Sequence, residues 1–158
     1  MIQEHIDITV AARPETVLEV LKDVESVDGW LRPLLPAWPK IASSMTVVES
    51  FQDGSPRLVR TVTSAFGISD DALTEYEWFP DGCRLTLIES RTLRHNVSQF
   101  TIIPDDPQTR LTADVSLDLK IRLPGLLERQ LKKSQVGFIK SFQQGLAAES
   151  ARRELACE

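Results

Sequence analysis

The stretch RLTADVSLDLKIRLPG, residues 110–125, joins a β-rich region to a long helix. Apolar and polar residues alternate along most of this stretch, which is the pattern of a strand with one buried face. Pro124-Gly125 ends the strand, and residues 126–154 then run without a proline. The sequence therefore predicts a final strand followed by one helix that is long enough to cover a whole sheet.

The region before this stretch predicts an antiparallel meander. Its β-like segments are separated by turn dipeptides such as Asp53-Gly54 and Asp81-Gly82, and not by crossover helices. Six strands are expected here, near residues 45–52, 57–66, 71–79, 83–90, 93–103 and 110–122. The elements expected before them are a strand at 5–10, a short helix at 14–23, a helical turn at 25–30 and a proline-rich loop.

Composition limits the class of protein. A length of 158 residues suits a single domain, predicted to span residues 1–158. The net charge of −5 gives no general attraction for phosphate, which argues against nucleic-acid binding. Cys83 and Cys157 lack the spacing of a metal site or a disulfide framework, and no cofactor is expected. Because no run approaches about 20 apolar residues, we expect a cytoplasmic protein without stable membrane insertion.

Several short motifs are typical of a known fold. They are Ala12-x-Pro14-Glu15-x-Val17, Asp23, Trp30, Tyr76-x-Trp78 and Leu123-Pro124-Gly125. With this order of elements, the sequence resembles the START-like helix-grip superfamily (SRPBCC), in particular its polyketide cyclase/dehydrase and lipid-transport branch. The resemblance implies an α+β fold in which a curved seven-stranded antiparallel sheet wraps around the C-terminal helix, with two short helices after the first strand. It also implies an apolar cavity for polyketide-like or lipid-like ligands, and no catalytic residue common to the superfamily.

The turns predict which side chains face that cavity. A two-residue hairpin loop at Asp81-Gly82 pairs Trp78 with Leu85 and Tyr76 with Leu87, so that all four share the concave face. The assignment is sensitive, because a shift of one residue turns every side chain of a strand to the opposite face.

Two polar residues form a candidate catalytic pair. The neighbouring turns set Glu89 against His95 and Arg60 against Tyr76. A carboxylate that orients an imidazole makes it a general acid or base near neutral pH, so Glu89 and His95 are the candidate catalytic residues. The resemblance implies an aldol-type cyclisation and dehydration, in which Arg60 or Tyr76 would stabilise an enolate oxygen. The alternative is a solvated cross-strand pair that contributes only to stability.

The predicted cavity combines an apolar wall with a few polar groups, as small-molecule sites do. The ligand-binding residues expected on the strands are Arg60, Tyr76, Trp78, Leu87, Val97, Gln99 and Leu117. On the last helix, Gly137 and Ser141 belong to a stripe of small residues that leaves space either for a ligand or for the close approach of another segment. The apolar loop at 31–38 forms a lid over the cavity, contacts a membrane surface, or packs below the edge of the sheet.

The sequence thus predicts a monomer or homodimer that binds a hydrophobic small molecule. Three functions are consistent with it: a polyketide cyclase or dehydratase, a non-catalytic carrier of lipids or isoprenoids, and a protein that docks on another macromolecule. None of the three involves a metal ion. The candidate pair separates the first two functions, because only a cyclase depends on Glu89 and His95.

Overall fold

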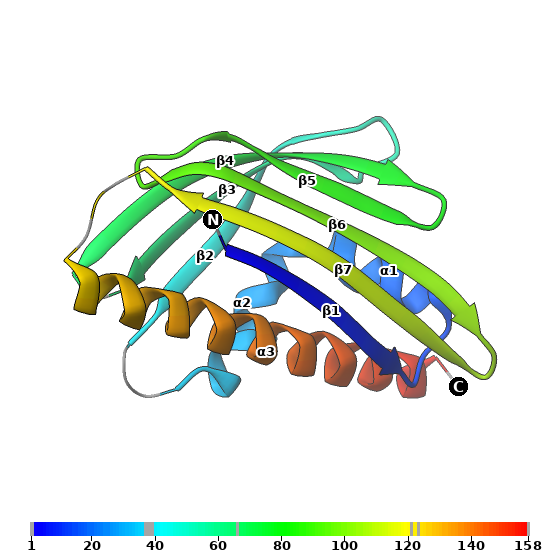
Figure 1. Ribbon diagram of the computed structural model, residues 1–158. Helices are drawn as coiled ribbons and strands as arrows, with labels where there is room; N and C mark the ends of the chain where they lie inside the picture. The colour runs from blue at the N-terminus through cyan, green and yellow to red at the C-terminus, as the bar shows by residue number, and fades with distance from the viewer. Residues whose placement is uncertain (1, 37–39, 66, 121, 123, 158) are drawn as a thin grey trace.

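The computed structural model describes residues 2–36, 40–65, 67–120, 122 and 124–157. A seven-stranded antiparallel sheet with the strand order β1-β7-β6-β5-β4-β3-β2 curves around the long helix α3, as Figure 1 shows. The short helices α1 and α2 lie between the sheet and α3 and contact α3. The predicted α+β helix-grip architecture is therefore confirmed.

The elements follow the predicted order. The strands are β1 (Ile2–Val10), β2 (Ala42–Ser50), β3 (Pro56–Ala65), β4 (Ile68–Phe79), β5 (Gly82–Glu89), β6 (Leu93–Asp105) and β7 (Gln108–Leu119). The helices are α1 (Pro14–Lys22), α2 (Val27–Leu31) and α3 (Gly125–Ala156), with 3-10 turns η1 (Val24–Ser26) and η2 (Arg32–Leu34). The differences from the predicted ranges are a few residues at strand ends, where periodicity carries little information.

The main core lies where β1, β6 and β7 face α1 and α3. α1 begins at Pro14, whose missing N–H costs nothing in the first turn, and it buries one apolar face. The buried residues of this core cluster are Ile6, Val10, Ala12, Val17, Val20, Leu21, Cys83, Phe100, Ile102, Leu111, Ala113 and Leu146. Burial on this scale supplies the main favourable term for folding and fixes α1 against the sheet.

α3 is buried only in its C-terminal half. The buried residues of α3 are Ser141, Gly145, Leu146 and Ser150. The helix is therefore attached to the rest of the protein mainly through its second half.

A network of charged side chains ties this half of α3 to α1. Arg153 donates to Glu149 (Nε to Oε1, 3.0 Å) and to Asp23 after α1 (Nη2 to Oδ2, 2.8 Å). Hydrogen bonds from Arg152 and Arg153 lower the pKa of Glu149 to about 2. An unfolded glutamate titrates near pH ~4.3, so the stabilisation by ionised Glu149 is complete above that pH and is lost as the pH falls toward the lower value.

The pairing of β4 with β5 differs from the predicted register by an even number of residues. Tyr76 pairs with Leu85 and Trp78 with Cys83, and the hairpin loop precedes Gly82. A Cβ atom at Gly82 would lie 1.9 Å from the carbonyl oxygen of Phe100, so this glycine serves the close approach of β6 and not the turn. An even shift leaves the faces unchanged, and the predicted orientation of these strands is correct.

The pairing of β5 with β6 differs by an odd number, so the predicted face of β6 is wrong. Leu85 pairs with Ser98 and not with Gln99. The turn before β6 is built on Asp70, which accepts hydrogen bonds from the Ser90 hydroxyl and the Arg91 amide. This arrangement places Phe100, the largest apolar side chain of β6, in the core, where its burial is most favourable.

The predicted face of β3 is also wrong. Arg60 pairs with Leu73 and not with Tyr76. Ala65 pairs with Ile68, and Gly67 has a φ of 73°, a conformation that glycine adopts without strain in a tight turn. The turn is therefore shorter than the one predicted, and β3 presents its opposite face to the core.

Arg153 allows a test of the network between α1 and α3. Arg153→Met should lower the free energy of unfolding by about 1–3 kcal/mol, because Glu149 and Asp23 would lose a cation that is largely shielded from water. Urea unfolding measures this change. The control is Arg110→Met, which removes an exposed pair with Asp7 and should leave the midpoint almost unchanged. Equal midpoints for the two variants would contradict a stabilising role for Arg153.

Gly137 and Gly145 provide a matched test of helix packing. A Cβ atom at Gly145 would lie 2.5 Å from Cε3 of Trp30, whereas a Cβ atom at Gly137 would meet nothing within 4 Å. Gly137→Ala should stabilise the protein by about 0.5–1 kcal/mol through helix propensity. Gly145→Ala should destabilise it, because overpacking costs about 1–3 kcal/mol. Thermal unfolding of both variants decides the matter, and a gain in stability for Gly145→Ala would be inconsistent with a tightly packed Trp30.

Candidate functional site

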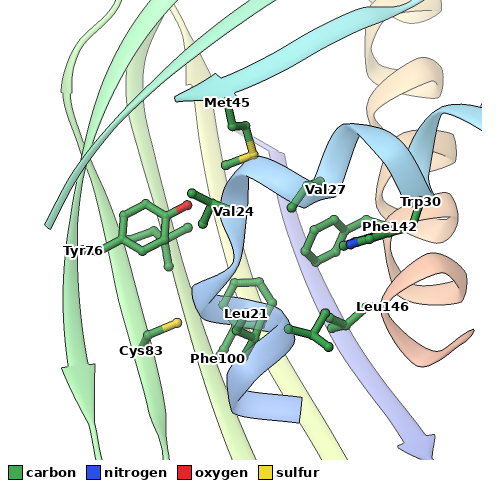
Figure 2. A pocket seen from close by; sticks show the side chains of 12 residues that line it. Leu21, Val24, Val27, Trp30, Met45, Tyr76, Cys83, Phe100, Phe142 and Leu146 are labelled. Carbon is green, nitrogen blue, oxygen red and sulfur yellow. The ribbon is translucent and has the colours of Figure 1, made fainter. Parts of the chain in front are cut away.

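A pocket of about 80 Å³ lies between the concave face of the sheet and the helices that cover it (Figure 2). The sheet contributes Met45, Tyr76, Cys83, Leu85 and Phe100. The helical side contributes Val20, Leu21, Val24, Val27, Trp30, Phe142 and Leu146. No Lys, Arg, His, Asp or Glu is among these lining residues, so the pocket is apolar and uncharged at neutral pH.

The segment from α1 to α2 reaches the pocket through a regular spacing. Leu21, Val24, Val27 and Trp30 follow one another at intervals of three residues. This spacing keeps side chains on one face of consecutive short helical turns. The chain therefore lines the pocket continuously even though α1, η1 and α2 are separate elements.

Aromatic rings form one side of the pocket. The ring of Phe142 on α3 lies 5.6 Å from that of Trp30 and 6.1 Å from that of Phe100, measured between centroids. Such tilted pairs are favourable beyond the area that they bury. The three rings therefore connect α2, α3 and β6 at the pocket.

The sheet side of the pocket carries two buried polar groups. Burial raises the pKa of the Tyr76 hydroxyl above its ordinary value and raises the pKa of the Cys83 thiol to about 12. Both groups are therefore neutral at physiological pH. They can donate hydrogen bonds to a ligand, but neither is a base or a thiolate nucleophile there.

Four of the predicted ligand-binding residues lie on the concave face. Tyr76 lines the pocket. Trp78 packs beside it, with ring centroids 5.8 Å apart, and donates its indole N–H to the carbonyl oxygen of Pro56 (2.8 Å). Leu87 lies two residues from the lining residue Leu85, and Leu117 is buried farther along β7. Trp78, Leu87 and Leu117 are not among the lining residues of the pocket.

Three other predicted contacts lie on the convex face. Val97 and Gln99 alternate with Phe100, which faces the pocket, so they point away from it. Arg60 binds Asp71 on the outer face, with Nε 2.8 Å from Oδ1. The predicted orientations of Arg60, Val97 and Gln99 are therefore wrong, as a consequence of the odd shifts of β3 and β6.

The predicted pairing of Glu89 with His95 is also wrong. Glu89 is exposed and pairs with Leu73 of β4. His95 lies opposite Asp118 on the convex face, and its Nε2 is 2.9 Å from the Ser116 hydroxyl. The catalytic roles of Glu89 and His95 remain predictions, but the structure does not bring these two residues together.

The stripe of small residues on α3 accommodates a neighbouring segment. Trp30 packs on Gly145, and the Ser141 hydroxyl donates to the carbonyl oxygen of Leu34 (3.2 Å). Gly137 has open space beside it. The stripe was expected to leave space either for a ligand or for another segment. At Ser141 that space is taken by another segment, the chain at Leu34. The predicted loop at 31–38 begins with buried Leu31 and continues through η2, while residues 37–39 lie outside the described residues.

Most of the pocket lining was not predicted from the sequence. Val24, Val27, Met45, Phe100 and Phe142 were all missed as lining residues. Val24 and Val27 could have been found from the sequence, because Leu21, Val24, Val27 and Trp30 recur every three residues. For Phe100, the alternation Phe100-Thr101-Ile102 indicates the buried face of β6 directly.

Neither a metal site nor a membrane-spanning helix is found among residues 2–36, 40–65, 67–120, 122 and 124–157. No group of three or more His, Cys, Asp or Glu side chains in these ranges could hold a metal ion. No helix in the same ranges is long and apolar enough to cross a bilayer.

The comparisons with known proteins agree on the fold. Residues 1–151 match the family model described as polyketide cyclase / dehydrase and lipid transport. A START superfamily protein from Mycobacterium smegmatis has a TM-score of 0.72 and 21% identity over 99% of each chain. A Thermus thermophilus protein has a TM-score of 0.77 and 21% identity over 96% of this chain and 99% of that one. An aromatase/cyclase from a Streptomyces species has a TM-score of 0.65 and 18% identity over 96% of each. The comparison with curated proteins gives no match.

The two cysteines should differ sharply in reactivity. Cys83 is buried with its pKa raised to about 12, whereas Cys157 is exposed. In the native protein, the thiol reagent DTNB should therefore react quickly with Cys157 and slowly with Cys83. Cys157→Ser should remove the fast reaction, and urea should release the slow one. Fast modification of both thiols in the native state would contradict the burial of Cys83.

Proposed function

The chain belongs to the polyketide cyclase / dehydrase and lipid transport family, and on this basis we propose that it binds a hydrophobic small molecule in the pocket. The observation that carries the proposal is the lining, which places apolar side chains from the sheet and from three helices around one internal space. Such a site favours an apolar ligand, because burial of apolar surface on both partners is favourable.

The volume indicates how a ligand would enter. Pockets for drug-sized ligands usually measure ~300–1,000 Å³, and this pocket measures about 80 Å³. A ligand of more than a few heavy atoms therefore requires the covering segment to move. The flanks of the segment from η1 to η2 suit this role, because the hydrogen bonds described for them are few: Glu25 accepts from the Val47 amide (3.2 Å), and Leu34 accepts from Ser141 (3.2 Å). Between these flanks, α2 stays packed on Gly145 through Trp30.

The chemistry of the lining favours binding and transport over acid–base catalysis. An aldol-type cyclisation needs a base near the reacting carbon, and both Tyr76 and Cys83 hold their protons at neutral pH. The similarity to an aromatase/cyclase keeps cyclisation as the second candidate. In that case, the Tyr76 hydroxyl is a donor on the sheet side of the pocket for a ligand carbonyl.

Filling the pocket tests the proposal. The probe is N-phenyl-1-naphthylamine, a neutral fluorophore whose emission rises in apolar surroundings. The wild-type protein should bind it saturably, and Val24→Phe should weaken binding about tenfold or more, because the larger side chain occupies the ligand volume.

The control is Val62→Phe, a substitution of the same kind at an exposed position of β3. Its affinity should match that of the wild type, and urea unfolding should show that both variants are folded. The proposal fails if the wild type shows no saturable binding, or if Val24→Phe binds the probe as tightly as Val62→Phe does.

A further inference from the structure

The indole nitrogen of Trp30 is a polar atom of the pocket without a hydrogen-bond partner among the described residues. This nitrogen is buried. An indole N–H is a donor only, so its role does not depend on an assigned tautomer or side-chain flip. A buried donor without an acceptor is unfavourable, and such groups in native proteins usually bind something.

The position of this donor is fixed by packing. Atoms Cε3 and Cζ3 of the indole lie against Gly145, at 2.5 and 2.6 Å from where a Cβ atom would stand. These atoms belong to the edge of the indole opposite Nε1, so contact with α3 turns the N–H away from Gly145. Figure 2 shows the nitrogen beside the ring of Phe142, on the pocket side.

A water molecule would be a poor partner for this N–H. Buried waters typically make about three hydrogen bonds, whereas the other polar side chains of the lining, Tyr76 and Cys83, lie on the sheet across the pocket from Trp30, as Figure 2 shows. A ligand that carries its own acceptor atom satisfies Trp30 with one hydrogen bond and fills the apolar space with the rest of its surface.

The charge of the ligand follows from the same lining. Within the described part of the chain, no cationic side chain lines the pocket. Lys22 instead lies over the ring of Trp78, 5.4 Å from its centroid, and Arg153 is paired with Asp23 and Glu149. A carboxylate or phosphate in the pocket would be buried without a counter-charge, which is strongly unfavourable.

We propose that the ligand is a neutral apolar molecule with a carbonyl or ether oxygen, and that the Trp30 indole N–H binds this oxygen. The inference rests on the proposed function, because it names the class of molecule that the pocket takes. It makes Trp30 the residue that selects an oxygen-bearing ligand over a pure hydrocarbon of the same shape.

Three probes of similar size test it: acetophenone, α-methylstyrene, in which a CH₂ group replaces the carbonyl oxygen, and benzoate. Titrations followed by ¹H–¹⁵N spectra of the labelled protein give the affinities and report on the Trp30 indole directly. Acetophenone should bind about tenfold tighter than α-methylstyrene, as expected for one hydrogen bond to a buried donor. Acetophenone alone should shift the Trp30 indole proton downfield, and benzoate at pH 7 should not bind.

Two variants assign the effect. Trp30→Phe should abolish the preference for acetophenone, so that acetophenone and α-methylstyrene bind this variant with equal affinity. Trp78→Phe is the matched control, because the Trp78 N–H already donates to Pro56 and its loss should leave the preference intact.

The outcomes distinguish a failure of the proposed function from a failure of the role assigned to Trp30. If neither neutral probe binds, the proposed function fails and the inference fails with it. If both bind equally, or if benzoate binds as well as acetophenone, the inference is overturned while the proposed function stands. If Trp30→Phe does not fold, the wild-type spectra decide, because acetophenone must move the Trp30 resonance downfield and α-methylstyrene must not.

Discussion

The contact between Trp30 and Gly145 determines where the covering segment sits. α2 contains only five residues, so it cannot hold a position through its own backbone hydrogen bonds. Its place comes from the indole ring, which lies where a side chain on α3 would otherwise stand. Because Gly145 has no side chain, α2 lies close to α3 and the same ring lines the helical side of the pocket. The pocket thus depends on the absence of a side chain at Gly145 as much as on the residues that line it.

The order of elements was predictable because each follows from a local pattern. Alternation identified the strands, and the length of the proline-free C-terminal segment identified α3. The faces of the strands were harder, because they depend on the parity of each turn. The loop between β4 and β5 was misplaced by one residue, which shifts the pairing by two and preserves the face. The turns before β4 and β6 gave odd shifts, which reversed Arg60 and Gln99.

The chemistry of the observed pocket differs from the predicted chemistry as a result of these shifts. The sequence interpretation placed an acid, a base and a cation inside the cavity, whereas Arg60, Glu89 and His95 lie toward solvent or on the convex face. What remains inside is an apolar lining with neutral donors. No periodic pattern could have revealed the unpartnered Trp30 nitrogen, because its environment results from packing among α2, α3 and the sheet. An error of one residue in the predicted strand register is therefore enough to turn a binding pocket into an apparent catalytic site.

The one-sided burial of α3 has a consequence for its local stability. Ser141 to Ser150 carry its buried contacts, and the ion pairs of Arg153 lie beyond them. The first four turns, from Gly125 onward, include no buried residue. Opening of a helix costs least where few buried contacts are lost, so α3 should fray progressively from its N-terminal end while its final turns stay docked. Unwinding of that end would enlarge the space facing the sheet without disturbing the contact between Trp30 and Gly145. α3 thus combines an N-terminal half that can open with a C-terminal half that stays docked.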